Sequence, residues 1–132
     1  LLTYKFVVRN GGEIDASNLV LYNIFSHMND EFIIDGTGRN SNWKPYLVGP
    51  VSAPAGATVY YSEYADHRVT TDGTYSGTDD WRTEPYNWQS VKAIKVVFPD
   101  AYVLPKKCWC RCTHRWSISF LRQTSRTGPS VR

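Results

Sequence analysis

The densest group of metal-binding side chains lies near the end of the chain, where Cys108, Cys110, Cys112 and His114 alternate with other residues. Thiolates and imidazoles are the side chains that zinc prefers. In a strand, however, alternate residues lie about 6.6 Å apart, so these four side chains would spread over about 20 Å. A tetrahedral ion cannot collect them at that spacing, and thiols two residues apart on a strand are poor disulfide partners. The sequence therefore predicts free thiols and no metal.

Carboxylates gather in a polar segment that contains Asp72, Asp79 and Asp80. Calcium requires roughly six to eight oxygen ligands, and loops of surface β-domains often provide them. No spacing in this segment matches a defined calcium loop, and Asp is also common in solvated turns. We expect no cofactor, with calcium at these three residues as the alternative.

Three tryptophans, Trp43, Trp81 and Trp88, lie in or beside polar loops. Exposed rings beside Asp and Asn would form a platform on which sugars stack. Large aromatic side chains also commonly close the open ends of a β-sandwich. The sequence favours this second role, and the sugar platform is the basis of an alternative function, a carbohydrate-binding module.

Few residues are available for enzyme chemistry. Of the three histidines, neither His27 nor His67 lies in a nucleophile motif. The chain contains no Gly-x-Ser-x-Gly, His-Glu-x-x-His or phosphate-binding loop. The adjacent carboxylates Asp79 and Asp80 point apart if the chain is extended there. We expect no catalytic residues and no enzymatic activity.

Short apolar and alternating runs separated by turns dominate the chain, which predicts strands at residues 3–9, 18–25, 32–34, 46–52, 57–63 and 91–98. The only helical element expected is a short turn at residues 88–91. Together these elements predict an all-β fold, an antiparallel β-sandwich of about seven strands. Alternation within the strands gives the expected inward-facing core as Tyr4, Phe6, Val8, Leu21, Val59, Tyr61, Ile94, Val96 and Phe98.

The formal net charge of +3 conceals an uneven distribution. Residues 1–105 contain 8 Lys and Arg and all 12 Asp and Glu, whereas residues 106–132 contain 7 Lys and Arg and no acid. The acidic body gives no reason to expect specific nucleic-acid binding, although the basic end could attract polyanions in a salt-sensitive way. No apolar run approaches the ~20 residues of a membrane-spanning helix. The chain opens almost directly on a strand, and we expect it to be a piece of a longer polypeptide.

Two stretches resemble the immunoglobulin-like repeat domains of large Gram-positive cell-surface proteins. The first runs from an alternating strand through a Gly-containing loop and is carried by Tyr4, Phe6, Val8, Asn10, Gly12, Ala16, Asn18, Leu19 and Leu21. The second runs from a "Val-Tyr-Tyr-Ser" strand through a Trp-containing loop and is carried by Val59, Tyr60, Tyr61, Ser62, Trp81, Trp88, Val91, Ala93, Ile94 and Lys95. The resemblance covers roughly residues 2–105.

This resemblance implies an immunoglobulin-like β-sandwich that serves as a spacer, stalk or adhesin module. It also implies an extracellular, cell-wall-associated location and no catalytic residues. The expected partners are neighbouring domains of the same polypeptide, and a host or cell-wall glycan or protein.

Residues 106–132 depart from the pattern, so we divide the chain into a body, 1–105, and an atypical basic segment, 106–132. If the segment is native, the alternation in residues 116–121 predicts the final strand, followed by a mobile end from Arg122. The alternative is that it is not native to the domain, which would leave a sheet edge open.

Overall fold

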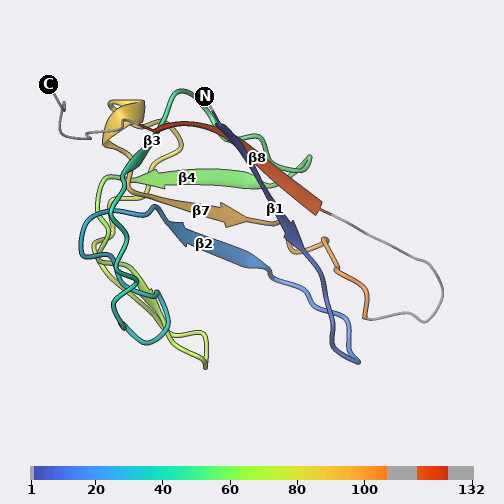
Figure 1. The fold of residues 1–132 in the computed structure, drawn as a ribbon. Coiled ribbons are helices and arrows are strands. Elements are labelled where there is room, and N and C mark those ends of the chain that lie inside the picture. Colours follow the sequence, from blue (N-terminus) through green and yellow to red (C-terminus); the bar gives the residue numbers. More distant parts are fainter. Residues whose placement is uncertain (1, 107–115, 125–132) are drawn as a thin grey trace, which may run out of the picture.

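The fold comes from a computed structural model, which describes residues 2–106 and 116–124. The described residues form small antiparallel sheets with almost no helix, which confirms the all-β class. The strands are β1 (Leu2–Val8), β2 (Val20–Ile24), β3 (Pro45–Leu47), β4 (Thr58–Ser62), β5 (Arg68–Val69), β6 (Tyr75–Ser76), β7 (Ala93–Val97) and β8 (Trp116–Thr124), with one short 3-10 helix, η1 (Trp88–Ser90) (Figure 1).

The central sheet has the order β2-β7-β4. Leu21 pairs with Val96, which also pairs with Val59, and this row of apolar side chains lies on one face. One residue along, Tyr22 and Tyr60 flank Lys95 on the other face, because successive side chains of a strand point to opposite sides.

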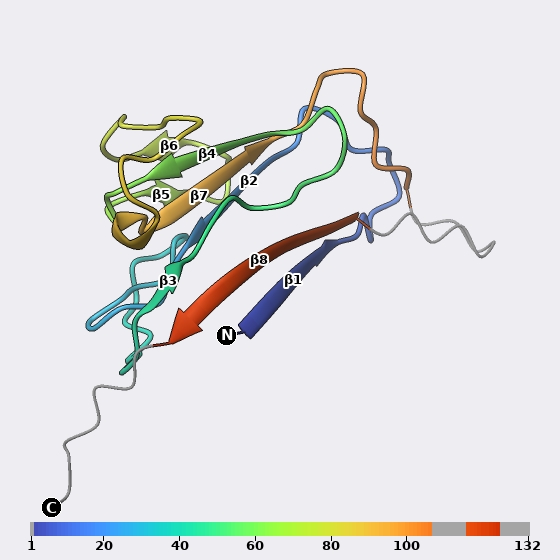
Figure 2. The same ribbon diagram turned by 90° about the horizontal axis from the view of Figure 1, so that it is seen from above.

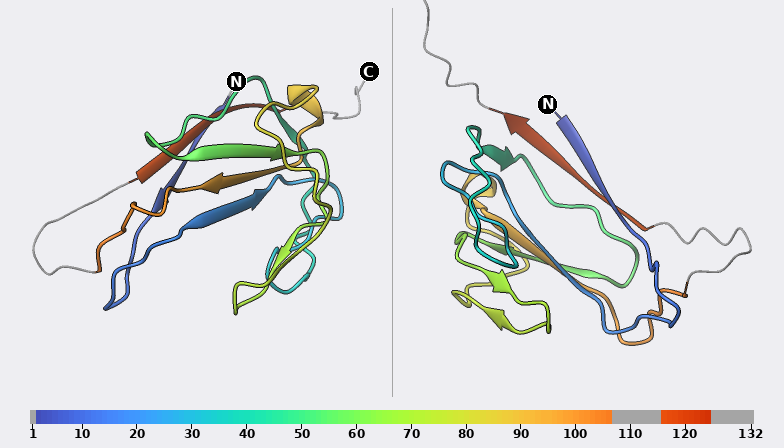
Figure 3. Two further views of the ribbon diagram at one scale, coloured as in Figure 1. Left: turned by 180° about the vertical axis from the view of Figure 1, so that it is seen from behind. Right: turned by 60° about the horizontal axis from the view of Figure 1, so that its bottom comes forward.

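The second sheet has the order β1-β8-β3. β8 is antiparallel to both neighbours and is the only link between β1 and β3 in this sheet. Figures 2 and 3 show the two three-stranded sheets facing each other across the molecule.

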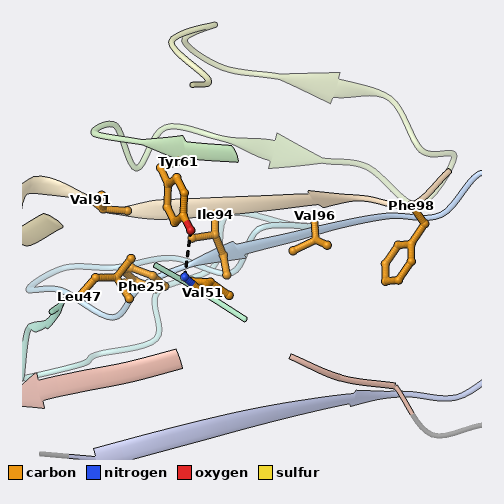
Figure 4. Packing of buried hydrophobic residues seen from close by; sticks show 8 residues of the cluster. All are labelled: Phe25, Leu47, Val51, Tyr61, Val91, Ile94, Val96 and Phe98. Atoms are coloured by element: carbon orange, nitrogen blue, oxygen red, sulfur yellow. Dashed lines mark hydrogen bonds between the residues drawn. The ribbon is translucent and has the colours of Figure 1, made fainter. Parts of the chain in front are cut away.

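An apolar cluster fills the space between the sheets (Figure 4). Of the expected core, the four most buried members are Tyr61, Ile94, Val96 and Phe98. The partly buried members that pack against them are Tyr4, Phe6, Leu21 and Val59, which confirms the predicted inward face for eight of the nine residues. Val8 is half-buried and lies outside this cluster. The cluster also includes residues that strand alternation did not supply: Phe25, Leu47, Val51 and Val91.

Tyr61 shows how the loops are joined to this core. Its hydroxyl accepts a hydrogen bond from the backbone N–H of Val51 at 2.9 Å (Figure 4). This contact satisfies a buried polar group of the 48–57 connection, which the sequence had placed partly in a strand.

Two strand predictions are wrong in detail. In place of the expected strand at 32–34, residues 33–35 form a turn, and the N–H of Gly36, which adopts φ 71°, donates across it to the carbonyl oxygen of Phe32 at 2.9 Å. Phe32 and Ile34 are consequently 53% and 57% exposed. The expected strand at 46–52 is limited to β3, because Gly49 and Pro50 interrupt the pattern one residue after it ends. The helical turn expected at 88–91 is present as η1, whose cap Asn87 accepts from the N–H of Gln89 at 2.9 Å.

β8 contains the final strand expected at 116–121 and continues to Thr124, which pairs with Pro45. The expected mobile end from Arg122 is therefore wrong for residues 122–124, and residues 125–132 lie outside the described residues. The Cys108, Cys110, Cys112 and His114 group lies outside the described residues. Whether residues 106–132 are native to the domain stays a prediction.

Candidate functional site

Ser62, His67 and Asp80 come together on the face of the central sheet that points away from the apolar cluster. Ser62 is the last residue of β4 and pairs with Ala93 in β7. The chain after β4 then turns back across this face, forms the β5–β6 hairpin and returns with Asp80. Ser62 is 1% exposed and His67 is 0% exposed, so the returning chain seals them against the sheet.

The hydrogen bonds around His67 have a single consistent direction. Asp80 can only accept, so the Ser62 hydroxyl donates to its Oδ1. The oxygen of Ser62 is then free to accept from His67 Nε2–H, which lies 2.7 Å away. In a neutral ring Nδ1 then accepts, and its donor is the Tyr75 hydroxyl, which lies 2.7 Å from Nδ1 and 3.5 Å from its other acceptor, the Thr78 carbonyl oxygen.

The groups at the two ends of this series of hydrogen bonds, Tyr75 and Asp80, also have partners. The Tyr75 oxygen accepts from the indole Nε1–H of Trp81 at 3.1 Å. Asp80 Oδ2 accepts from the backbone N–H of Glu63 at 2.9 Å. Burial raises the pKa of the Tyr75 phenol, so this group keeps the proton that it donates to His67. We call Ser62, His67, Tyr75, Asp80 and Trp81 the outer-face network.

Aromatic rings cover the outer-face network. Trp81 stacks on His67 with ring centroids 4.3 Å apart, and Tyr75 stacks on Tyr22 of β2 at 5.3 Å. The ammonium of Lys95 lies 4.8 Å from the Trp81 ring centre and 4.9 Å from that of Tyr60. Burial lowers the pKa of Lys95, an effect that the charge of Asp79 opposes.

Gly77 allows the hairpin to approach this closely. It adopts φ 137°, a conformation that L side chains rarely take. A Cβ at this position would lie 2.9 Å from His67 Nδ1 and 3.0 Å from His67 Cα. The next residue, Thr78, donates its N–H to Asp66 Oδ2 at 3.0 Å and its hydroxyl at 2.7 Å, which closes the loop around the imidazole.

Serine, histidine and aspartate in contact suggest acyl-transfer chemistry, but the arrangement differs from a catalytic triad. In a triad the carboxylate holds the histidine and the ring nitrogen facing serine carries a lone pair. Here Asp80 holds the serine, and the nitrogen facing Ser62 is an N–H donor. Burial is the main cause that lowers the pKa of His67, opposed by Asp66 and Asp80. The network is suited to joining three segments of chain, and it presents no nucleophile to solvent.

The structure separates two of the three tryptophans proposed as a sugar platform. Trp81 lies on the outer face of the central sheet. Trp88 meets the buried Tyr61 edge-on, with centroids 5.1 Å apart and planes at 88°, on the apolar-cluster side. Trp43, in the segment before β3, is 36% exposed.

The three candidate calcium ligands do not form one group: Asp72 and Asp80 accept hydrogen bonds from other parts of the protein, and Asp79 is exposed. Asp72 turns the β5–β6 hairpin, where it accepts from the Thr70 hydroxyl and from the Thr74 N–H, and these bonds lower its pKa to about 2. Asp80 belongs to the outer-face network, while its neighbour Asp79 is exposed. Within residues 2–106, no three His, Cys, Asp or Glu side chains are placed to hold a metal ion.

A buried carboxylate, Asp30, lies in a separate loop; the sequence offers it, with Glu31 and Asp35, only as a further possible calcium ligand. It is 1% exposed and accepts from the Ser41 hydroxyl at 2.8 Å, while Arg39 lies 3.4 Å away. Burial opposes ionisation of Asp30, but the bonds from Ser41 and the charge of Arg39 outweigh it and lower the pKa. Asp30 thereby holds together the two sides of the 28–43 loop, as Asp80 holds the chain after β6 to the end of β4.

Comparison with known proteins adds no relative, because no protein-family model, curated protein or solved structure matches the chain. Among the described residues, no helix is long and apolar enough to cross a bilayer.

Proposed function

We propose that the chain is a non-enzymatic module of an extracellular bacterial surface protein, with an immunoglobulin-like β-sandwich fold, and that it acts as a spacer or adhesin domain. The sequence resemblance over residues 2–105 supports the family. Two facing antiparallel sheets around one apolar cluster are compatible with that fold.

The observation that carries the proposal is that the side chains that could act as nucleophile and base are buried and hydrogen-bonded to one another. Ser62 and His67 are both buried, and each makes its hydrogen bonds within the fold. A hydrolase of this type would need the serine hydroxyl at a surface that substrate can reach. In this chain the same groups fasten the β5–β6 hairpin to the central sheet, which is a scaffold role. The proposed partners are neighbouring domains and a glycan or protein of the host or cell wall, with no cofactor.

A fluorophosphonate probe tests the non-enzymatic part. We expect mass spectrometry of the native chain to find no adduct on Ser62, because the probe cannot reach the hydroxyl. The matched control is Ser62→Ala, and heat-denatured protein corrects for background labelling. An adduct on the native chain that Ser62→Ala abolishes would overturn the proposal.

Carbohydrate binding remains the second candidate, and the exposed ring of Trp43 is the observation that favours it. Trp43→Ala should then abolish binding on a glycan array while leaving the melting temperature unchanged. Tyr86→Ala is the control, since Tyr86 is 83% exposed and lies beside Arg82 in a different loop. Equal binding by both variants would remove the sugar-platform role of Trp43.

A further inference from the structure

A cavity separate from the outer-face network lies where β2 and β4 finish and where β3 and β7 begin. These strand ends are at the left of Figure 1. Its volume is about 290 Å³. Four separate segments line it, at residues 25–28, 44–45, 65 and 91–92, and they come from both three-stranded sheets and their connections. Ligand pockets commonly occupy roughly 300–1,000 Å³, which makes this one large enough for a single small unit.

The cavity concentrates positive charge on an acidic body. Lys44 and Lys92 line it from two different segments, and no Asp or Glu does. Four other cations of the body are engaged, since Arg39 and Arg68 form ion pairs and Arg82 and Lys95 lie over aromatic rings. The remaining two, Lys5 and Arg9, lie outside the cavity lining. Among the described residues, Lys44 and Lys92 are exposed and make no ion pair. Two unpaired ammonium groups at one cavity favour a negatively charged ligand.

The cavity also offers a hydrogen-bond donor and an acceptor. Ser26 is 5% exposed, and its oxygen accepts from Arg39 Nη2 at 3.5 Å, which leaves its own hydroxyl hydrogen to donate. His27 Nδ1 lies 3.0 Å from the carbonyl oxygen of Phe25. A carbonyl only accepts, so Nδ1 carries the hydrogen and Nε2 of the neutral ring is an acceptor.

The remaining lining is apolar and includes Met28 and Val91. Met28 lines the cavity and is 63% exposed, so its flexible apolar side chain is available to a ligand. An apolar wall beside charged and hydrogen-bonding groups matches a ligand with a C–H face, an acid group and hydroxyls.

We propose that this cavity binds a small carboxylated sugar, such as the uronic acid unit of a glycan. The carboxylate pairs with Lys44 and Lys92, the ring C–H face packs on Met28 and Val91, and the hydroxyls meet Ser26 and His27. Inorganic phosphate could meet the lysines and Ser26 but has no C–H face for the apolar wall at Met28 and Val91, which is why a sugar acid fits better. The inference extends, and rests on, the adhesin part of the proposed function.

Isothermal titration at low ionic strength with D-glucuronate, D-glucose and inorganic phosphate tests the proposal. We expect glucuronate to bind, and both glucose and phosphate to bind at least tenfold more weakly. The double variant Lys44→Gln/Lys92→Gln should weaken glucuronate binding by at least about tenfold, the loss expected when two charge-assisted contacts are removed. Lys5→Gln is the matched control, because Lys5 is also an exposed lysine but lies in β1, outside the cavity lining.

Three results would overturn the proposal: no glucuronate binding, equal binding of glucose or phosphate, or unchanged binding by the double variant. None of them affects the fluorophosphonate test. The two proposals can therefore fail separately: an adduct on Ser62 overturns the non-enzymatic module, and unselective binding overturns the sugar-acid site.

Discussion

His67 is the residue on which the polar contacts of the outer face converge. Its two ring nitrogens connect Ser62 at the end of β4 with Tyr75 in β6, and Trp81 covers its ring. A buried imidazole of this kind costs free energy if either nitrogen loses its partner. The sequence shows only a histidine in a polar loop, because nothing local indicates that the loop folds back over the sheet.

The stability of the chain should depend on His67 at mildly acid pH. Burial lowers its pKa in the folded state, and the groups facing it are Asp66, Asp80, the Tyr64 carbonyl and Lys95. The unfolded chain, with a histidine pKa near 6.5, therefore binds a proton more readily. Stability from this residue is complete above about pH 6.5 and decreases as the pH falls toward the folded-state pKa.

Urea unfolding between pH 7.5 and 5 measures this effect. The free energy of unfolding of the parent chain should decrease over that range, and His67→Gln should lose part of the slope because glutamine does not titrate. Asp30, which is buried, and Asp66, which is exposed, have lowered pKa values and act below about pH 4, outside the window. Parallel pH profiles for the two proteins would show that His67 does not titrate differently on folding.

At the scale of elements, the β5–β6 hairpin covers a sheet face that alternation alone would leave in solvent. The pattern of residues 57–63 correctly places Tyr60 and Ser62 opposite Val59 and Tyr61. The alternating pattern of β4 cannot show that the outer face is covered near Ser62, because the covering residues, 66–82, lie later in the sequence. Polar segments with little local pattern acquire their conformation from such contacts, which is why β5, β6 and the turn at residues 33–35 were not predicted.

Gly77→Ala should detach this hairpin from the sheet. The new Cβ would overlap His67 and would also impose a strained φ, at a combined cost of about 2–5 kcal/mol. Gly73→Ala is the matched control in the same hairpin: it also has positive φ, but no other atom lies within 4 Å of its Cβ position, so strain alone costs about 1–2 kcal/mol. Urea unfolding of both variants gives the comparison. Equal losses would mean that Gly77 does not set the contact with His67.

At the scale of the whole molecule, the two sheets share one apolar cluster, and the sequence predicted most of its strand residues. It did so because Ile94, Val96 and Phe98 keep a strict alternation through β7. Phe25, Leu47, Val51 and Val91 were missed because they lie at strand ends or in connections, where burial depends on the pairing of distant segments. The candidate cavity has the same origin, since four separate segments form it.

Deleting residues 106–132 should abolish cooperative folding. The deletion removes β8, which lies between β1 and β3 and pairs with both. Without it, the second sheet has no hydrogen-bonded connection and the apolar cluster loses one side. Thermal unfolding followed by circular dichroism should change from a sigmoidal transition to a broad slope. A truncated chain that unfolds as sharply as the parent would show that residues 106–132 are not part of the domain.

The tautomer of His67 tests most directly whether its contacts with Ser62 and Tyr75 are structural. The ¹⁵N chemical shifts of the imidazole, measured by NMR at neutral pH, distinguish a protonated from an unprotonated ring nitrogen. The hydrogen bonds to Ser62 and Tyr75 predict a neutral ring with the proton on Nε2 and a lone pair on Nδ1. A neutral ring with the proton on Nδ1 would contradict this account, because a lone pair on Nε2 would then face Ser62 as a general base does.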